Sequence, residues 1–155
     1  MHLPKEYIVL EKREGIKLQC KLNGDSVQQE IDHIIIGPCG VILIETKNYS
    51  GKITIDENGN WKRETEKGEF GEKNPLQQIE RHHYVVETIL DDNIPIHDII
   101  CIANDSAIIE GTENFVVPII KSDMLVYNIK KLPKKENITD KDIQDIIKKI
   151  EAARI

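Results

Sequence analysis

The chain has 155 residues, of which 39% are hydrophobic and 31% charged, and its formal net charge is −6. This length can form one domain with a hydrophobic core, and the acidic balance excludes a globally basic nucleic-acid-binding protein, although not a local basic patch or metal site. No apolar stretch approaches the ~18 residues that cross a membrane, and three cysteines without a C-x-x-C pair or signal peptide favour a reduced, cytoplasmic location.

The first half of the chain is predicted to be mostly β-structure, because its apolar residues are chiefly isoleucine, valine and leucine in short runs. The predicted strands are 6–11, 16–22, 28–37, 40–48, 51–56 and 58–64, with a turn at 13–15 and a polar loop at 23–26. The strands 28–37 and 40–48 have glycine at both corners of a short connection, which predicts a β-hairpin.

The second half of the chain alternates between helix and strand signals. We expect a polar loop at 65–74, a helix at 75–90 capped by Asn74, strands at 97–104 and 114–120 around an acidic loop at 105–113, a helical turn after Ser122, and an amphipathic helix at 139–150 with a Thr139–Asp142 capping box. The sequence therefore predicts a single α/β or α+β domain over residues 1–155, with a mixed β-sheet flanked by helices.

Charged residues end the most hydrophobic predicted strand of the hairpin. The apolar run 41–44 is followed by Glu45 and Lys47, which share one face of the strand. If the strands pair from the corners inward, Asp32 lies opposite Glu45 and Glu30 lies opposite Lys47. Like charges at such positions destabilise a sheet unless something compensates them.

Two interpretations of these charges remain open. On a solvated edge, Lys47 and other surface cations would neutralise the carboxylates, an arrangement worth roughly 0–1 kcal/mol. Alternatively, the carboxylates of Asp32 and Glu45, the backbone carbonyl of Thr46 and water suit Mg²⁺ or Mn²⁺, which prefer oxygen ligands. Lys47 could then hold a nucleophilic water or stabilise a charged phosphoryl transition state.

The same residues resemble a known nuclease pattern. Asp32 followed by "VILIETK" has the form D-x(n)-E-x-K of the PD-(D/E)xK superfamily, and "EIDHIIIGPCGVILIETKNYSGKI" (30–53) with "NPLQQIERHH" (74–83) closely resembles its nuclease-related domain family, often called NERD. The resemblance implies a restriction-endonuclease-like fold and divalent-metal-dependent cleavage of phosphodiester bonds. It matches Asp32 and Glu45 to the metal carboxylates, Lys47 to the catalytic lysine, and Gln78 to a helix glutamine near the site.

The chain departs from the family pattern at its start. Related proteins usually begin with a further helix bearing a G-E motif, whereas "HLPKEYIVL" is similar to the segment just after that helix. The resemblance thus implies a member that lacks this N-terminal helix and its glutamate, with weak activity or inactivity as one expected outcome.

For several other residues, a purely structural role is the alternative to a functional one. We expect Glu30 to be a structural partner of Lys47, with a role as a third acidic ligand as the alternative. We expect His33 to be a packed or hydrogen-bonded core histidine and not a ligand. His82 lies one helical turn after Gln78, so a role near the substrate stays open, but His82 and His83 point about 100° apart and cannot form an i,i+4 metal pair. A phosphate track of scattered cations, namely Lys52, Lys62, Arg63, Lys73 and Arg81, is an alternative to ordinary surface charge.

We therefore expect a metal-dependent nuclease that uses Mg²⁺ or Mn²⁺ and hydrolyses DNA or RNA. The expected partner is nucleic acid, with DNA favoured over RNA. We expect no interaction with a membrane, and a homodimer is possible. The alternatives are a non-catalytic nucleic-acid-binding or protein-interaction module that retains the fold, and a stable fold whose acidic residues serve only solubility.

Overall fold

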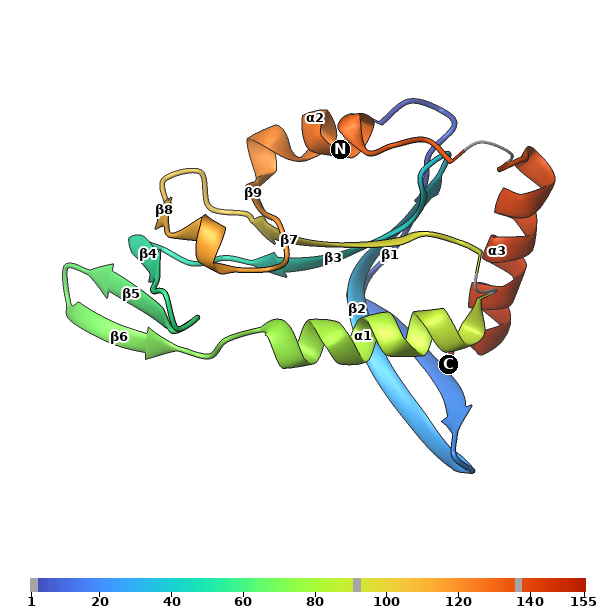
Figure 1. Ribbon diagram of the computed structural model, residues 1–155, viewed down its shortest axis with the longest axis horizontal. Coiled ribbons are helices and arrows are strands. Elements are labelled where there is room, and N and C mark those ends of the chain that lie inside the picture. Colours follow the sequence, from blue (N-terminus) through green and yellow to red (C-terminus); the bar gives the residue numbers. More distant parts are fainter. Residues whose placement is uncertain (1–2, 91–92, 136–137) are drawn as a thin grey trace.

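The computed structural model describes residues 3–90, 93–135 and 138–155, which form two β-sheets and three α-helices (Figure 1). The larger sheet has the order β1-β2-β3-β7-β9, with strands Ile8–Leu22, Asp25–Gly37, Gly40–Lys47, Ile96–Ile102 and Ile119–Lys121. The smaller sheet has the order β6-β5-β4-β8, with strands Gly68–Glu72, Trp61–Thr65, Lys52–Ile55 and Ile108–Glu110. This mixed α+β architecture is the predicted class and is consistent with a nuclease-like fold.

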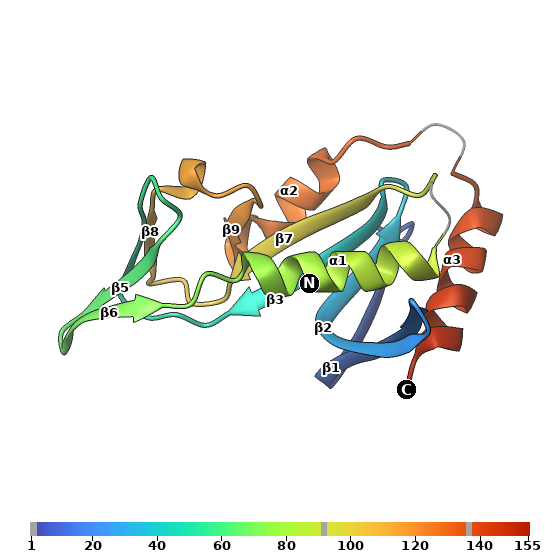
Figure 2. The same cartoon turned by 60° about the horizontal axis from the view of Figure 1, so that its bottom comes forward.

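The helices cover different parts of the larger sheet. Helix α1 (Leu76–Ile89) lies on one face and α2 (Leu125–Lys131) on the other, while α3 (Asp140–Ala153) packs at the β1–β2 end (Figures 1 and 2). Two 3₁₀ turns, η1 (Thr112–Asn114) and η2 (Ser122–Met124), lie in the connections around β9. Apolar side chains of β2 and β3 alternate between the α1 face and the α2 face, so both faces of these central strands are buried.

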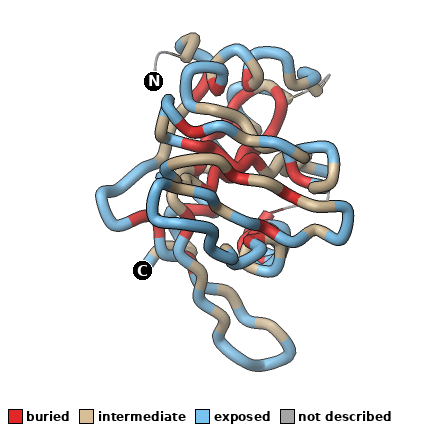
Figure 3. Tube along the Cα trace, turned by 90° about the vertical axis from the view of Figure 1, so that its left-hand side faces the viewer, coloured by how far each residue is buried: buried red, intermediate tan, exposed pale blue. Residues whose placement is uncertain are grey.

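The first strand differs from its prediction. We expected two strands around a turn at 13–15, but β1 is continuous and its pairing with β2 shifts register between Glu11 and Ile16. Gly15 has φ +86°, so glycine supplies a left-handed residue to a bulge and the chain continues in the same direction. The far end of this β1–β2 hairpin projects from the body and is largely exposed (Figure 3).

The predicted loops contain additional short strands. Strand β6 lies in the expected loop 65–74, and β8 lies in the expected loop 105–113. Conversely, the expected strand 114–120 is reduced to β9, which begins only after Pro118. Proline has no N–H to donate to a ladder, which explains why pairing with β7 starts there.

Side-chain caps define the beginnings of α1 and α3. The Asn74 side chain accepts a hydrogen bond from Leu76 N–H at 2.9 Å, although Pro75 occupies the cap position itself. The capping box of Thr139 and Asp142 is present as predicted. Ser122 makes no cap hydrogen bond, and its hydroxyl instead bonds the Asp105 carboxylate at 3.2 Å.

Two neighbouring strands continue from the larger sheet into the smaller one. Strand β3 leads to β4 and β7 leads to β8, and both pairs, β3–β7 and β4–β8, are parallel. Backbone bonds bridge the gap between the sheets, with Ala103 N–H donating to Lys47 O at 2.9 Å and Ile108 N–H to Gly51 O at 3.0 Å. Within the described ranges, no helix has the length and apolar character required to traverse a bilayer.

Candidate functional site

The end of the β2–β3 hairpin brings Asp32 beside Glu45. The predicted register is confirmed from Gly37–Gly40 to His33–Ile44, where the recorded ladder ends. Beyond it, the Asp32 carboxylate accepts a hydrogen bond from Thr46 N–H at 2.8 Å. Asp32 therefore connects to β3 through its side chain, and this bond fixes the carboxylate next to the polar end of the strand.

Glu45 is a buried carboxyl group with incomplete hydrogen bonding. Its exposed fraction is 7%, its Oε1 lies 3.6 Å from Lys47 Nζ, and its Oε2 lies 3.7 Å from His82 Nδ1. Oε2 has no hydrogen-bond partner within the described residues. Burial raises the pKa of Glu45 from its usual 4.5 to about 7, and the nearby Asp32 charge adds to the rise while Lys47 opposes it.

His82 extends from α1 toward this carboxyl group, while a role of His82 near a substrate stays a prediction. The side chain extends from α1 and is buried, with a 4% exposed fraction. Burial lowers the pKa of His82, and the Asp32 charge opposes that decrease. The neutral imidazole is therefore favoured, so His82 contacts Glu45 as a polar neighbour. The signal in the sequence was its position one turn after Gln78.

Gln78 is half-buried on α1. No hydrogen bond of its side chain occurs within the described ranges, so its predicted role near the carboxylates stays a prediction. Lys47 is more accessible than Glu45, with 24% of its side chain exposed, and ends β3 at the junction with the smaller sheet.

Sequence reasoning missed Asp98, a half-buried carboxylate of β7 that directly precedes the buried residues 99–102. Asp98 lines a cavity of about 10 Å³ together with Glu45 and His82, a space sufficient for about one water molecule. Its Oδ2 lies 2.6 Å from His83 Nδ1, and its buried Oδ1 has no partner within the described residues. Burial raises the pKa of Asp98, while the charge and the hydrogen bond of His83 act to lower it. A lone carboxylate inside an apolar strand run was the available signal.

Some predicted electrostatic partners are different in the structure. Glu30 pairs across the ladder with Lys17 and lies over Gly15, so the expected contact with Lys47 is wrong. The register shift in β1 and the divergence of β2 from β3 place Glu30 on the β1 side. His33 is not a core residue either, because it lies 3.2 Å from Glu11 with 31% of its side chain exposed.

Three of the proposed phosphate-track cations already have acidic partners in the smaller sheet. The pairs are Lys52–Glu110, Lys62–Glu69 and Arg63–Glu72. The positive charge of this sheet is therefore locally compensated, so it does not form a continuous basic surface.

The donor set around Glu45 fits a hard cation with few protein ligands. The described residues contain no group of three or more His, Cys, Asp or Glu side chains suited to a metal. However, Glu45 Oε2 has no hydrogen-bond partner among the described residues and the Asp32 charge acts on the same carboxyl group, so a cation would compensate both. Backbone oxygen and water complete such sites for Mg²⁺, which keeps several of its waters.

Comparison with known families places this arrangement in context. The model of the nuclease-related domain, NERD, matches residues 2–103, which include the whole hairpin, α1 and β7. The chain belongs to the nuclease-related domain family. The expected resemblance is thereby confirmed, and the NERD match covers every residue of the candidate site.

A similar sequence occurs in an uncharacterized protein of Bacillus anthracis. The two are 32% identical over 93 residues, which cover 59% of this chain and 41% of the relative. The chain thus matches less than half of that protein's length. No solved structure matches the chain significantly.

Proposed function

We propose that this NERD chain is a divalent-metal-dependent nuclease that hydrolyses phosphodiester bonds in nucleic acid, with DNA as the first substrate to test. The observation that carries the proposal is the pair of Asp32 on β2 and Glu45 near the end of β3, with Lys47 3.6 Å from Glu45 and with one buried oxygen of Glu45 that has no hydrogen-bond partner among the described residues. Membership of a nuclease-related family supports the same chemistry.

In this proposal, Asp32 and Glu45 hold Mg²⁺ or Mn²⁺, with the Thr46 carbonyl as a further oxygen donor. When bound, such an ion supplies a Lewis acid for the phosphate oxygens and an activated water. The Thr46 N–H bond orients Asp32, which holds its second oxygen in a defined direction. His82 limits water access to Glu45 from the helix side, because both side chains are buried.

Lys47 has a separate role from the two carboxylates. Lys47 is the last residue of β3 and its side chain is partly exposed, so its ammonium group can contact a phosphate from the solvent side. A cation fixed at that position stabilises the negative charge that develops on the phosphoryl oxygens. Lys47 therefore acts on the transition state, whereas Asp32 and Glu45 act on the metal.

Metal binding can be measured without any cleavage. Calorimetric titration with Mn²⁺ should give binding to wild type in the micromolar to millimolar range and much weaker binding to Asp32→Ala/Glu45→Ala. Lys130→Met, an exposed change on α2, serves as a matched control for Lys47→Met. Both lysine variants should retain Mn²⁺ affinity.

The cleavage test uses labelled single- and double-stranded DNA and RNA with Mg²⁺ or Mn²⁺ and an EDTA control. We expect wild type and Lys130→Met to cleave, and Glu45→Gln and Lys47→Met to lose most turnover. Binding without cleavage by wild type would instead favour the non-catalytic module, and cleavage by Glu45→Gln equal to wild type would contradict the proposed site.

A further inference from the structure

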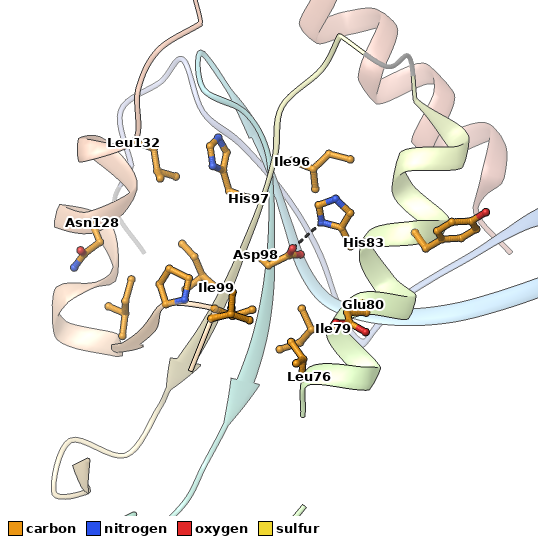
Figure 4. Close-up of a pocket in the computed structure, with 15 residues that line it drawn as sticks. Leu76, Ile79, Glu80, His83, Ile96, His97, Asp98, Ile99, Asn128 and Leu132 are labelled. Carbon is orange, nitrogen blue, oxygen red and sulfur yellow. Dashed lines mark hydrogen bonds and ion pairs between the residues drawn. The ribbon is translucent and has the colours of Figure 1, made fainter. Parts of the chain in front are cut away.

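A second surface adjoins the Glu45 cavity and shares Ile79, Asp98 and Ile99 with it. It is a groove of about 560 Å³ between α1 and α2, with the edge of β7 along its floor (Figure 4). Side chains of β7 enter it from both faces of the strand, and Val117 and Pro118 close one end. On α1, His82 faces Glu45, whereas the next residue, His83, lines this groove.

The floor of the groove is a strand edge without a neighbour. Strand β9 pairs only with residues 100–102 of β7, so residues 96–99 have no strand on that side within the described part of the chain. Pro118 ends the pairing, because the next bond along the ladder would need an N–H that proline lacks. An open edge of this kind is a template for one more strand.

The direction of the backbone groups follows from the recorded bonds. Pro95 O accepts from Val41 N–H at 2.9 Å, so the carbonyl of this odd-numbered residue points to β3. Ile100 N–H donates to Pro118 O at 2.9 Å, so even-numbered residues point to the β9 side. Because backbone groups alternate along a strand, the N–H and C=O groups of Ile96 and Asp98 point into the groove.

The walls of the groove define the side chains that fit. Apolar and aromatic residues contribute from α1, from the connection between η1 and β9, from β9 and from Leu132 just after α2, and two of them, Val116 and Tyr84, are 79% and 49% exposed. None of its described lining residues is lysine or arginine, and because the Asp98 carboxylate is paired with His83 at 2.6 Å, the negative charge of the groove lies at the exposed Glu80. This charge disfavours a nucleic-acid backbone and favours a cationic side chain.

We propose that this groove binds an extended peptide segment of a partner protein, which adds as a strand to the edge of β7. Its alternate apolar side chains pack between α1 and α2, and a lysine or arginine side chain lies toward Glu80. The peptide backbone supplies the donors and acceptors for Ile96 and Asp98, and the apolar walls supply the burial. This proposal does not depend on the nuclease chemistry at Glu45.

The test uses NMR of the ¹⁵N-labelled chain and an array of blocked hexapeptides based on acetyl-Thr-Val-Lys-Val-Thr-Val-amide, with the lysine moved through each position. At least one peptide should shift the amide signals of residues 96–99 on titration. N-methyl groups can be placed on either of the two alternating sets of backbone amides of this peptide. In one of these two versions the methyl groups replace the N–H groups that face β7, and that version should bind at least about tenfold more weakly because it cannot complete the ladder.

Two variants separate backbone pairing from charge. Ile96→Pro removes one N–H that faces the groove and should weaken binding, whereas Ile96→Val keeps it and should not. Glu80→Lys changes an exposed helix position, so the fold is kept, and it should weaken the lysine peptides more than their neutral analogues.

Several results would overturn the proposal. They are an array in which no peptide shifts these amides, equal binding of both N-methylated versions, and shifts of the same amides by a DNA oligonucleotide. Concentration-dependent shifts without peptide, with a dimer in analytical ultracentrifugation, would show that a second copy of the chain occupies the edge instead of a partner.

Discussion

Replacing Glu45 with glutamine should stabilise the metal-free protein, and the gain should grow with pH. The pKa of Glu45 is raised from 4.5 to about 7, so the folded state binds a proton more tightly than the unfolded state does. Ionising this buried carboxyl group therefore costs stability as pH rises from 4.5, and the cost is complete above about 7. From these pKa values the penalty is about 1 kcal/mol at pH 5 and about 3 kcal/mol at pH 8.

Urea denaturation in EDTA at pH 5, 6, 7 and 8 measures this penalty as the difference in unfolding free energy between Glu45→Gln and wild type. Glu69→Gln removes the same charge from an exposed position, and its difference from wild type should be small and nearly independent of pH. Glu45→Gln less stable than wild type at pH 8, or a difference that does not change with pH, would refute the argument that burial dominates at Glu45.

Five further substitutions test three other features of the structure by the same denaturation assay. Asp32→Ala leaves Thr46 N–H without its acceptor and should cost about 1–3 kcal/mol, while Asp32→Asn keeps an acceptor and should cost less; equal costs would contradict the bond. Gly111→Ala should cost about 2 kcal/mol or more, because Gly111 has φ +82° and a Cβ there would collide with a backbone carbonyl. As a control, Gly24 has φ +86° but open space around the Cβ position, so Gly24→Ala should cost only about 1 kcal/mol. Thr139→Ala removes the capping box and should cost about 1 kcal/mol, and no loss would show that α3 does not need it.

Local signals made the hairpin and the last helix predictable. The two glycine corners, Gly37 and Gly40, set the register from 33 to 44, because they pair with each other around a two-residue connection. The capping box and the spacing of isoleucines predicted α3 equally well. Asp32 and Glu45 were brought together by the same hairpin, although by a side-chain bond to Thr46 that strand alternation alone does not predict.

The remaining features depend on tertiary contacts. Strands β6 and β8 are short, and their residues became strands because partners from the smaller sheet were available. Gly15 looked like a turn residue because a bulge and a turn use the same left-handed conformation. The position of Asp98 beside both His83 and the Glu45 cavity requires α1 to lie across β7, which no pattern within either segment specifies.

The two connections between the sheets, β3 to β4 and β7 to β8, fix the end of β3 and leave the outer edge of the smaller sheet open to sequence change. The short connections 48–51 and 103–107 join the two sheets side by side, so the end of β3 cannot rotate without breaking the bonds at Ala103 and Ile108. In the outer hairpin, β5 contacts this junction through Arg63–Ser50 and Trp61–Tyr49, whereas β6 is the edge strand beyond it. Changes of length or charge in the exposed β5–β6 turn and the start of β6 can therefore alter the surface of the smaller sheet and leave the carboxylates in place, which provides a route to new ligand preferences at little cost in stability.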